Sequence, residues 1–182
     1  MNNDIKKVLI SKEEIEAKTA ELGKAISRDY KGKEPLVVGL LKGVVPFIGD
    51  LIKNIDVYCE VDFLRVRSYE GDKSTGNVNM SGYVPEVKGK DIILVDDILD
   101  TGNTLLKIRK LFLNAGANSV KICVLLDKPE GREVDIEADY IGFNVPKEFV
   151  VGYGLDYNQK YRNLPYIGVL KEEVYMRWFY AR

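Results

Sequence analysis

The chain has 182 residues, of which 46% are hydrophobic and 30% charged, the balance of one globular domain with a core of its own. Its 27 basic and 28 acidic side chains leave a net charge of -1, which excludes a general attraction to nucleic acid or to anionic membranes. Because the sequence contains no histidine, His-based triads and most catalytic zinc sites are excluded as well.

Helices and buried strands are predicted to alternate in the first third of the chain. A capping box over residues 11–14, Ser-Lys-Glu-Glu, predicts a helix that continues to about Tyr30. The continuous apolar run 36–41 predicts a strand that is buried on both faces and ends at Lys42-Gly43. A short helix is expected to follow, from Pro46 to about Lys53.

The same alternation is predicted further along the chain. Residues 55–69 are expected to be extended, and the polar, glycine-containing segment 70–82 is expected to be a loop. Apolar runs predict buried strands at 92–95 and 120–126, with a helix at 104–115 between them. Two later short strands are predicted, at 138–143 and 149–153.

This alternation predicts an α/β fold with a mostly parallel sheet that is covered by helices on both faces. In such sheets, ligands bind beyond the carboxyl ends of the strands. The residues at those ends are Lys42, the segment 96–104 and Asp127-Lys128, so a binding site is expected there.

The cysteines and the apolar runs help to predict the cellular compartment of the protein. Cys59 and Cys123 lie inside apolar runs, which favours buried thiols in a reducing cytosol over a disulfide. The first residues lack the basic and then apolar pattern of a signal peptide, and no apolar run approaches the roughly 20 residues of a membrane span. We therefore expect a cytoplasmic protein.

The most informative segment is 92–105, in which an apolar strand runs into three acids and then into a Thr-Gly-Asn-Thr turn that opens a helix. A helix start presents free amides and a positive dipole end, and small residues let a phosphate approach them. The acids could hold sugar hydroxyls or a divalent cation, so the segment fits a ribose phosphate. The alternative is a helix cap beside solvated acids, but the mutual repulsion of the acids favours a ligand or cation.

Segment 92–105 resembles the motif with which type I phosphoribosyltransferases bind phosphoribosyl pyrophosphate (PRPP). The resemblance covers about residues 10–171 and is strongest to the hypoxanthine-guanine members of that family. It implies one domain over residues 1–182, with a small hood over the active site formed mainly by about 135–182 together with N-terminal residues. The other stretches that carry the resemblance are 40–43 (Leu-Leu-Lys-Gly), 67–69 (Arg-Ser-Tyr), 74–76 (Ser-Thr-Gly), 126–129 (Leu-Asp-Lys-Pro) and 149–157 (Phe-Val-Val-Gly-Tyr-Gly-Leu-Asp-Tyr).

The resemblance assigns the acids and the turn to PRPP. Asp96 and Asp97 would bind the ribose hydroxyls, directly or through Mg²⁺, although the family often has Glu where this chain has Asp96. Asp100 would lie near N7 of the purine as general acid and base. The residues expected to cradle the 5′-phosphate are Thr101, Gly102, Asn103 and Thr104.

Further residues are implied to bind pyrophosphate and to form a lid. Lys42 and Gly43 would form a pyrophosphate loop preceded by a non-proline cis peptide, although an ordinary turn at a strand end would leave the same sequence pattern. Arg162 would also reach the pyrophosphate. Ser68 and Tyr69 would begin a lid over about 68–80 that excludes water, with a surface loop without function as the alternative.

Four more residues are implied to bind the purine. Lys128 would contact O6, and because an ammonium group only donates hydrogen bonds, it would favour a 6-oxopurine over adenine. Phe149 would stack on the base, and Val150 would offer its backbone to the purine edge. Asp156 would contact the 2-position or a second Mg²⁺. Without the resemblance, a surface lysine and a core strand explain the same residues.

The resemblance implies a purine-salvage enzyme that uses PRPP, a 6-oxopurine and Mg²⁺ and that assembles as a homodimer or homotetramer. One alternative is a regulator on the same fold that binds nucleotides to control nucleic-acid binding. The balanced charge and the lack of a DNA-binding segment before Ser11 speak against it. A closer alternative is a sister transferase that uses xanthine. The aromatic tail 175–182 lies outside the resemblance and is expected to pack on its own subunit or on a neighbouring one.

Overall fold

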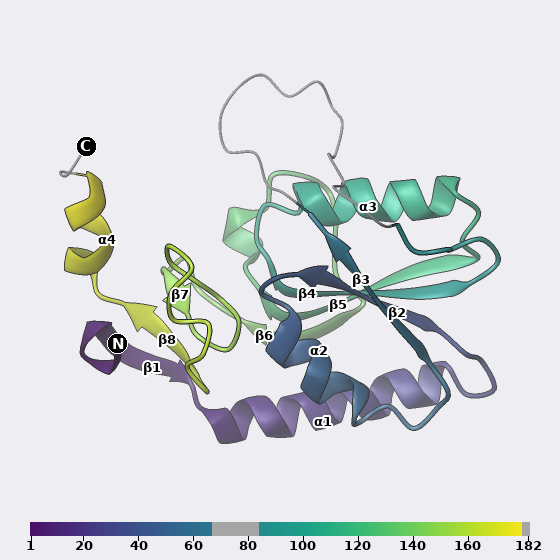
Figure 1. Cartoon of the computed structure of the whole chain (residues 1–182), viewed down its shortest axis with the longest axis horizontal. Helices are drawn as coiled ribbons and strands as arrows, with labels where there is room; N and C mark the ends of the chain where they lie inside the picture. Colours follow the sequence, from purple (N-terminus) through teal and green to yellow (C-terminus); the bar gives the residue numbers. More distant parts are fainter. Residues whose placement is uncertain (67–83, 180–182) are drawn as a thin grey trace.

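The computed structural model describes residues 1–66 and 84–179, and its largest unit is a five-stranded sheet (Figure 1). The spatial order is β3-β2-β4-β5-β6, and every neighbouring pair is parallel. The five strands are β2 (Leu36–Leu41), β3 (Glu60–Arg65), β4 (Asp91–Leu99), β5 (Ser119–Asp127) and β6 (Tyr140–Asn144). The predicted α/β class with a mostly parallel sheet is therefore confirmed.

Helices cover both faces of this sheet, because the side chains of its central strand alternate between two cores (Figure 1). Ile93 and Val95 pack toward α1 (Lys12–Asp29) and α2 (Val45–Ile52). Ile92 and Leu94 pack toward α3 (Asn103–Asn114) on the opposite face. All four side chains are fully buried, as the continuous apolar run predicted.

The capping box of α1 and the apolar stripe of α3 can both be compared with their predictions. The capping box is confirmed, since Ser11 Oγ accepts from the amide of Glu14 at 3.2 Å and a Glu14 carboxylate oxygen accepts from the amide of Ser11 at 2.7 Å. In α3, Ile108 and Phe112 are buried as predicted, but Leu111 is 37% exposed. The apolar stripe of α3 is therefore narrower than the sequence indicated.

A second, antiparallel sheet lies beside the first (Figure 1). Its order is β1-β8-β7, formed by Ile5–Ile10, Ile167–Leu170 and Val150–Val151. Helix α4 (Glu172–Phe179) follows β8 directly. Neither β1, β8 nor α4 was predicted, because β1 is half exposed without clean alternation and β8 has only four residues. No helix among the described residues is long and apolar enough to cross a membrane.

Candidate active site

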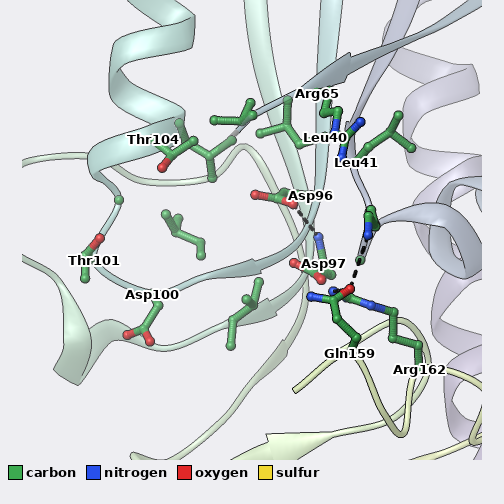
Figure 2. A pocket seen from close by; sticks show the side chains of 17 residues that line it. Leu40, Leu41, Arg65, Asp96, Asp97, Asp100, Thr101, Thr104, Gln159 and Arg162 are labelled. Carbon is green, nitrogen blue, oxygen red and sulfur yellow. Dashed lines mark hydrogen bonds between the residues drawn. The ribbon is translucent and has the colours of Figure 1, made fainter. Parts of the chain in front are cut away.

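A cavity of about 450 Å³ opens at the carboxyl ends of β2 and β4, where the fold class predicted a ligand (Figure 2). Nine of the predicted site residues line it: Lys42, Gly43, Asp96, Asp97, Asp100, Thr101, Gly102, Thr104 and Arg162. The lining also includes residues that were not predicted: Leu40, Leu41, Arg65, Val66, Ile98, Leu99, Leu105 and Gln159.

The first two acids belong to β4 and do not follow it. The strand was predicted to end at Val95, but it continues to Leu99 because β5 keeps pairing with it, with Asp96 opposite Val124. Inside the strand, the backbone amide of Asp97 donates to Asp96 Oδ1 at 3.0 Å. The strand therefore fixes both carboxylates rigidly at one wall of the cavity.

The carboxylates of Asp96 and Asp97 are poorly hydrated and lie close enough for their negative charges to repel each other. Burial raises the pKa of Asp96 well above its ordinary range, and the charge of Asp97 raises it further. Burial also raises the pKa of Asp97, against the lowering effect of the Arg162 guanidinium. A bound cation would relieve this repulsion.

Two adjacent carboxylates fit a magnesium ion that completes its shell with substrate oxygens and water, as Mg²⁺ commonly does. Among the described residues, no three acidic or cysteine side chains form a ready metal site. Asp156, the third predicted metal ligand, pairs with Arg162, with 2.6 Å between Asp156 Oδ1 and Arg162 Nη2.

Replacing Asp96 by Asn is expected to stabilise the ligand-free protein at pH 8 by about 0.5–2 kcal/mol, the usual range for a single stabilising change. A raised pKa means that the folded state binds the proton more tightly than the unfolded state, so stability falls as pH rises from 3.8 through the raised value. The variant should lose this part of the pH dependence. Urea unfolding from pH 5 to pH 8 in EDTA measures it.

The control for that experiment is Glu137→Gln, which removes an exposed carboxylate elsewhere on the surface. It should leave stability within about 0.5 kcal/mol of the wild type at every pH. A variant at Asp96 that is no more stable than the wild type at pH 8 would show that the carboxylate pair is not repulsive.

The turn between β4 and α3 leaves amides open toward the cavity. Gly102 precedes the helix with φ 84°, and no side chain caps the helix there among the described residues. The amide of Asn103 lies 3.4 Å from Thr101 Oγ1, at the limit of a hydrogen bond. The side chain of Asn103 turns away to Glu133, at 2.7 Å. A weakly capped helix start suits an anion better than the alternative in which this turn only caps the helix.

Cationic side chains face the acids across the cavity (Figure 2). Lys42 follows a cis peptide at Leu41–Lys42, as the resemblance predicted. Arg162 Nη1 donates to the carbonyl of Gly154 at 2.6 Å, and its Nε is buried without a hydrogen-bond partner in the described part of the chain. Gln159 Oε1 accepts from Lys42 Nζ at 3.3 Å and from Arg162 Nη2 at 3.4 Å. Gln159 was missed because no sequence pattern brings it to Lys42.

The backbone at Gly43 packs against the carboxylate of Asp97. A Cβ atom at this position would lie 1.7 Å from Asp97 Oδ2. A Cβ atom on Gly154, which has φ 101°, would lie 1.9 Å from the carbonyl oxygen of Gly43. The loop at Lys42-Gly43, predicted to bind pyrophosphate, is therefore packed directly against Asp97 and against the segment that carries Arg162.

The residues predicted to bind the purine lie outside the lining of this cavity. Lys128 Nζ is 3.8 Å from Asp100 Oδ2, so these two predicted residues do meet. Phe149 stacks on Tyr175 of α4, with 5.2 Å between ring centroids, which confirms that this part of the tail packs on its own subunit. Val150 is buried in β7. Two predicted lid residues, Ser68 and Tyr69, lie outside the described residues.

The chain belongs to the phosphoribosyl transferase family, whose domain model matches residues 9–158. It is 55% identical over 177 residues to the hypoxanthine-guanine phosphoribosyltransferase of Streptococcus thermophilus, covering 96% of this chain and 98% of that one. A hypoxanthine phosphoribosyltransferase from Staphylococcus aureus superposes with a TM-score of 0.92 at 49% identity, with 96% of each chain covered. The Trypanosoma cruzi hypoxanthine phosphoribosyl transferase superposes with a TM-score of 0.91 at 38% identity, with 97% of each covered. Within its family, the chain thus groups with the hypoxanthine-guanine phosphoribosyltransferases.

Proposed function

We propose that this protein transfers the phosphoribosyl group of PRPP to hypoxanthine or guanine and releases pyrophosphate, giving IMP or GMP. The observation that carries the proposal is that an acid pair, a weakly capped helix start and the cationic side chains of Lys42 and Arg162 surround one cavity. A sugar diol, a 5′-phosphate and a pyrophosphate need these three kinds of partner. The choice of hypoxanthine or guanine as the base rests on the names of the relatives.

Different residues of the cavity bind the ribose, the 5′-phosphate and the pyrophosphate of PRPP. Asp96 and Asp97 would hold the ribose hydroxyls, and their carboxylates are the groups that would hold a Mg²⁺ ion. The 5′-phosphate sits on the amides and hydroxyls of the turn from Thr101 to Thr104. Lys42, the amide of Gly43 and Arg162 bind the pyrophosphate, since all three residues line the cavity. When bound, Mg²⁺ supplies positive charge beside the leaving pyrophosphate.

In the reaction, a purine nitrogen forms a bond to C1 of the ribose while the bond from C1 to the pyrophosphate oxygen breaks. The proton on N7 passes to Asp100, whose carboxylate reaches the cavity from the turn after β4. Arg162 and Lys42 stabilise the charge that develops on the departing pyrophosphate. Much of the acceleration comes from holding purine and PRPP in line.

The purine is held beside Asp100 by residues that lie outside the lining of the cavity. Lys128 donates to O6, Phe149 stacks on the ring, Val150 offers its backbone, and Asp156 contacts the 2-position or a second metal ion. The ring of Phe149 is 41% exposed, which leaves surface for a base. We also propose that residues of about 135–182, together with the N-terminal segment, form a hood beside the purine.

We assign the protein to the cytoplasm as a homodimer or homotetramer. Its two cysteines are free thiols, as is usual in a reducing compartment. For the T. cruzi relative, the C-terminal region bears on oligomeric state and activity. In this chain the C-terminal helix α4 stacks on Phe149 through Tyr175.

The test is pyrophosphate release from PRPP and Mg²⁺ with hypoxanthine, guanine, xanthine and adenine added in turn. Release that requires hypoxanthine or guanine and fails with adenine supports the proposal. Release with xanthine at a comparable rate would widen the substrate class. A folded protein that binds PRPP but releases no pyrophosphate with any base would be a nucleotide-binding regulator.

Replacing Lys128 by Gln is expected to lower kcat/KM for hypoxanthine about 10- to 100-fold, as loss of a hydrogen bond to a charged group of roughly 1.5–3 kcal/mol predicts. An amide can also accept from the amino group of adenine, so the preference for hypoxanthine over adenine should narrow. Steady-state kinetics with both bases measure it. Lys147→Gln, at an exposed lysine, is the control. An unchanged ratio between the two bases would remove Lys128 from base selection.

A further inference from the structure

Arg132 holds the backbone of the turn that carries Asp100. Its Nη1 donates to the carbonyl oxygen of Leu99 at 3.0 Å and also to the carbonyl oxygen of Asp100. Its Nη2 forms an ion pair with Asp127, the last residue of β5, and Asp127 is only 7% exposed. One partly buried guanidinium thus joins the ends of β4 and β5 at the edge of the cavity.

The residues next to Arg132 fasten the same turn. The amide of Glu133 donates to the carbonyl of Thr101 at 3.0 Å. A Cβ atom on Gly131 would lie 1.8 Å from Asp100 Oδ1, so the backbone at Gly131 packs directly against the carboxylate. The segment 131–133 therefore packs along the turn after β4, and Arg132 contacts two successive carbonyl oxygens of that turn.

The carboxylate of Asp100 depends on this backbone for its direction. Its side chain is 46% exposed, and its carboxylate forms an ion pair with Lys128 at 3.8 Å, too long for a hydrogen bond. It accepts no side-chain hydrogen bond within the described ranges. The Cα–Cβ direction of Asp100 is thus set by the peptide groups on either side of it, and Arg132 binds the carbonyls of both.

We propose that Arg132, held by Asp127, is a positioning residue for the reaction: it fixes the two peptide planes that aim the Asp100 carboxylate and the first amides of α3. This inference rests on the proposed function. A planar guanidinium can bind two neighbouring carbonyls and a carboxylate at once, whereas an ammonium group is a single point of charge. The simpler alternative is an ion pair that stabilises the fold without any effect on the chemical step.

The variant Arg132→Lys distinguishes a positioning role from a purely structural ion pair. It keeps a cation for the buried Asp127 but loses the planar guanidinium that can bind two carbonyls. Positioning predicts that kcat, corrected for the folded fraction, falls roughly 10- to 100-fold, because a displacement of about 1 Å costs that much. KM for hypoxanthine should change less than about twofold. In Arg132→Ala, millimolar guanidinium chloride should restore part of kcat, and equal ammonium chloride should not.

The matched control is Lys121→Gln, which removes another ion pair of β5, 2.6 Å from Lys121 Nζ to Asp139 Oδ1, near the strand's opposite end. It should lower stability and leave kcat unchanged. A kcat for Arg132→Lys equal to that of the wild type, or equal recovery with both salts, would overturn the inference. If the wild type and the Lys121 variant also release no pyrophosphate, the proposed function itself has failed.

Discussion

Replacing Asp100 by Ala is expected to lower kcat for hypoxanthine about 10²- to 10⁴-fold, the usual contribution of one positioned acid or base. Its carboxylate lines the cavity and meets Lys128 only at 3.8 Å, so little folding energy depends on it. Stability should therefore stay within about 0.5 kcal/mol of the wild type, the usual range for a residue outside the core. Pyrophosphate-release kinetics and urea unfolding of the same preparation measure both quantities.

The matched control is Glu130→Ala, which removes an exposed carboxylate from the neighbouring segment. It should leave kcat unchanged, so that any loss at Asp100 is not a general effect of lost negative charge. Asp100→Asn keeps the shape of the side chain but cannot take up a proton, and its kcat should resemble that of the Ala variant. Near-normal turnover in both variants would assign the proton transfer to another group.

Gly43→Ala is the second change with a large expected effect. The new Cβ would lie 1.7 Å from Asp97 Oδ2, so the carboxylate or the loop must move. Overpacking of this kind costs about 1–3 kcal/mol of stability. A displacement of about 1 Å among groups that bind the reacting parts of PRPP should lower kcat/KM roughly 10²-fold. Thermal unfolding and kinetics with PRPP varied would measure the two effects.

Gly49 provides the control for this substitution, because the same atom added there meets nothing within 4 Å. Gly49 lies inside α2, where alanine is preferred to glycine by roughly 0.5–1 kcal/mol. Gly49→Ala should therefore stabilise the protein slightly and leave activity unchanged. Equal behaviour of the two alanine variants would mean that the loop at Gly43 adapts without moving Asp97.

The centre of the large sheet could be predicted because β2, β4 and β5 contain continuous apolar runs, such as Leu36–Leu41, which was predicted with its observed bounds. Strand β1 could not, because it contains two lysines and Val8 is 54% exposed. Its strand character comes from pairing with β8, a partner near the other end of the chain. Local pattern carries no information about such a partner.

Some residues of the candidate site could also be predicted from the sequence, and others could not. The acids and the turn up to Thr104 could be predicted because phosphate chemistry needs them consecutively on one strand end and helix start. Gln159 and Arg132 reach the same region from distant segments through backbone geometry, and Gln159 has φ 62°, a conformation that its side chain does not favour. The extension of β4 through Asp96 was missed because a charged residue in a central strand contradicts its usual composition.

The pairing of β1 with β8 also orders events during synthesis. Strand β1 leaves the ribosome before every other strand, yet its partner at Ile167 emerges only after the last strand of the large sheet, Tyr140–Asn144, has been made. A nascent chain can thus complete the parallel sheet and the turn at Thr101 while β1 is still without a partner. The segment that brings Arg162 to the cavity is translated after that, so the two sides of the cavity are built at different times by the same ribosome.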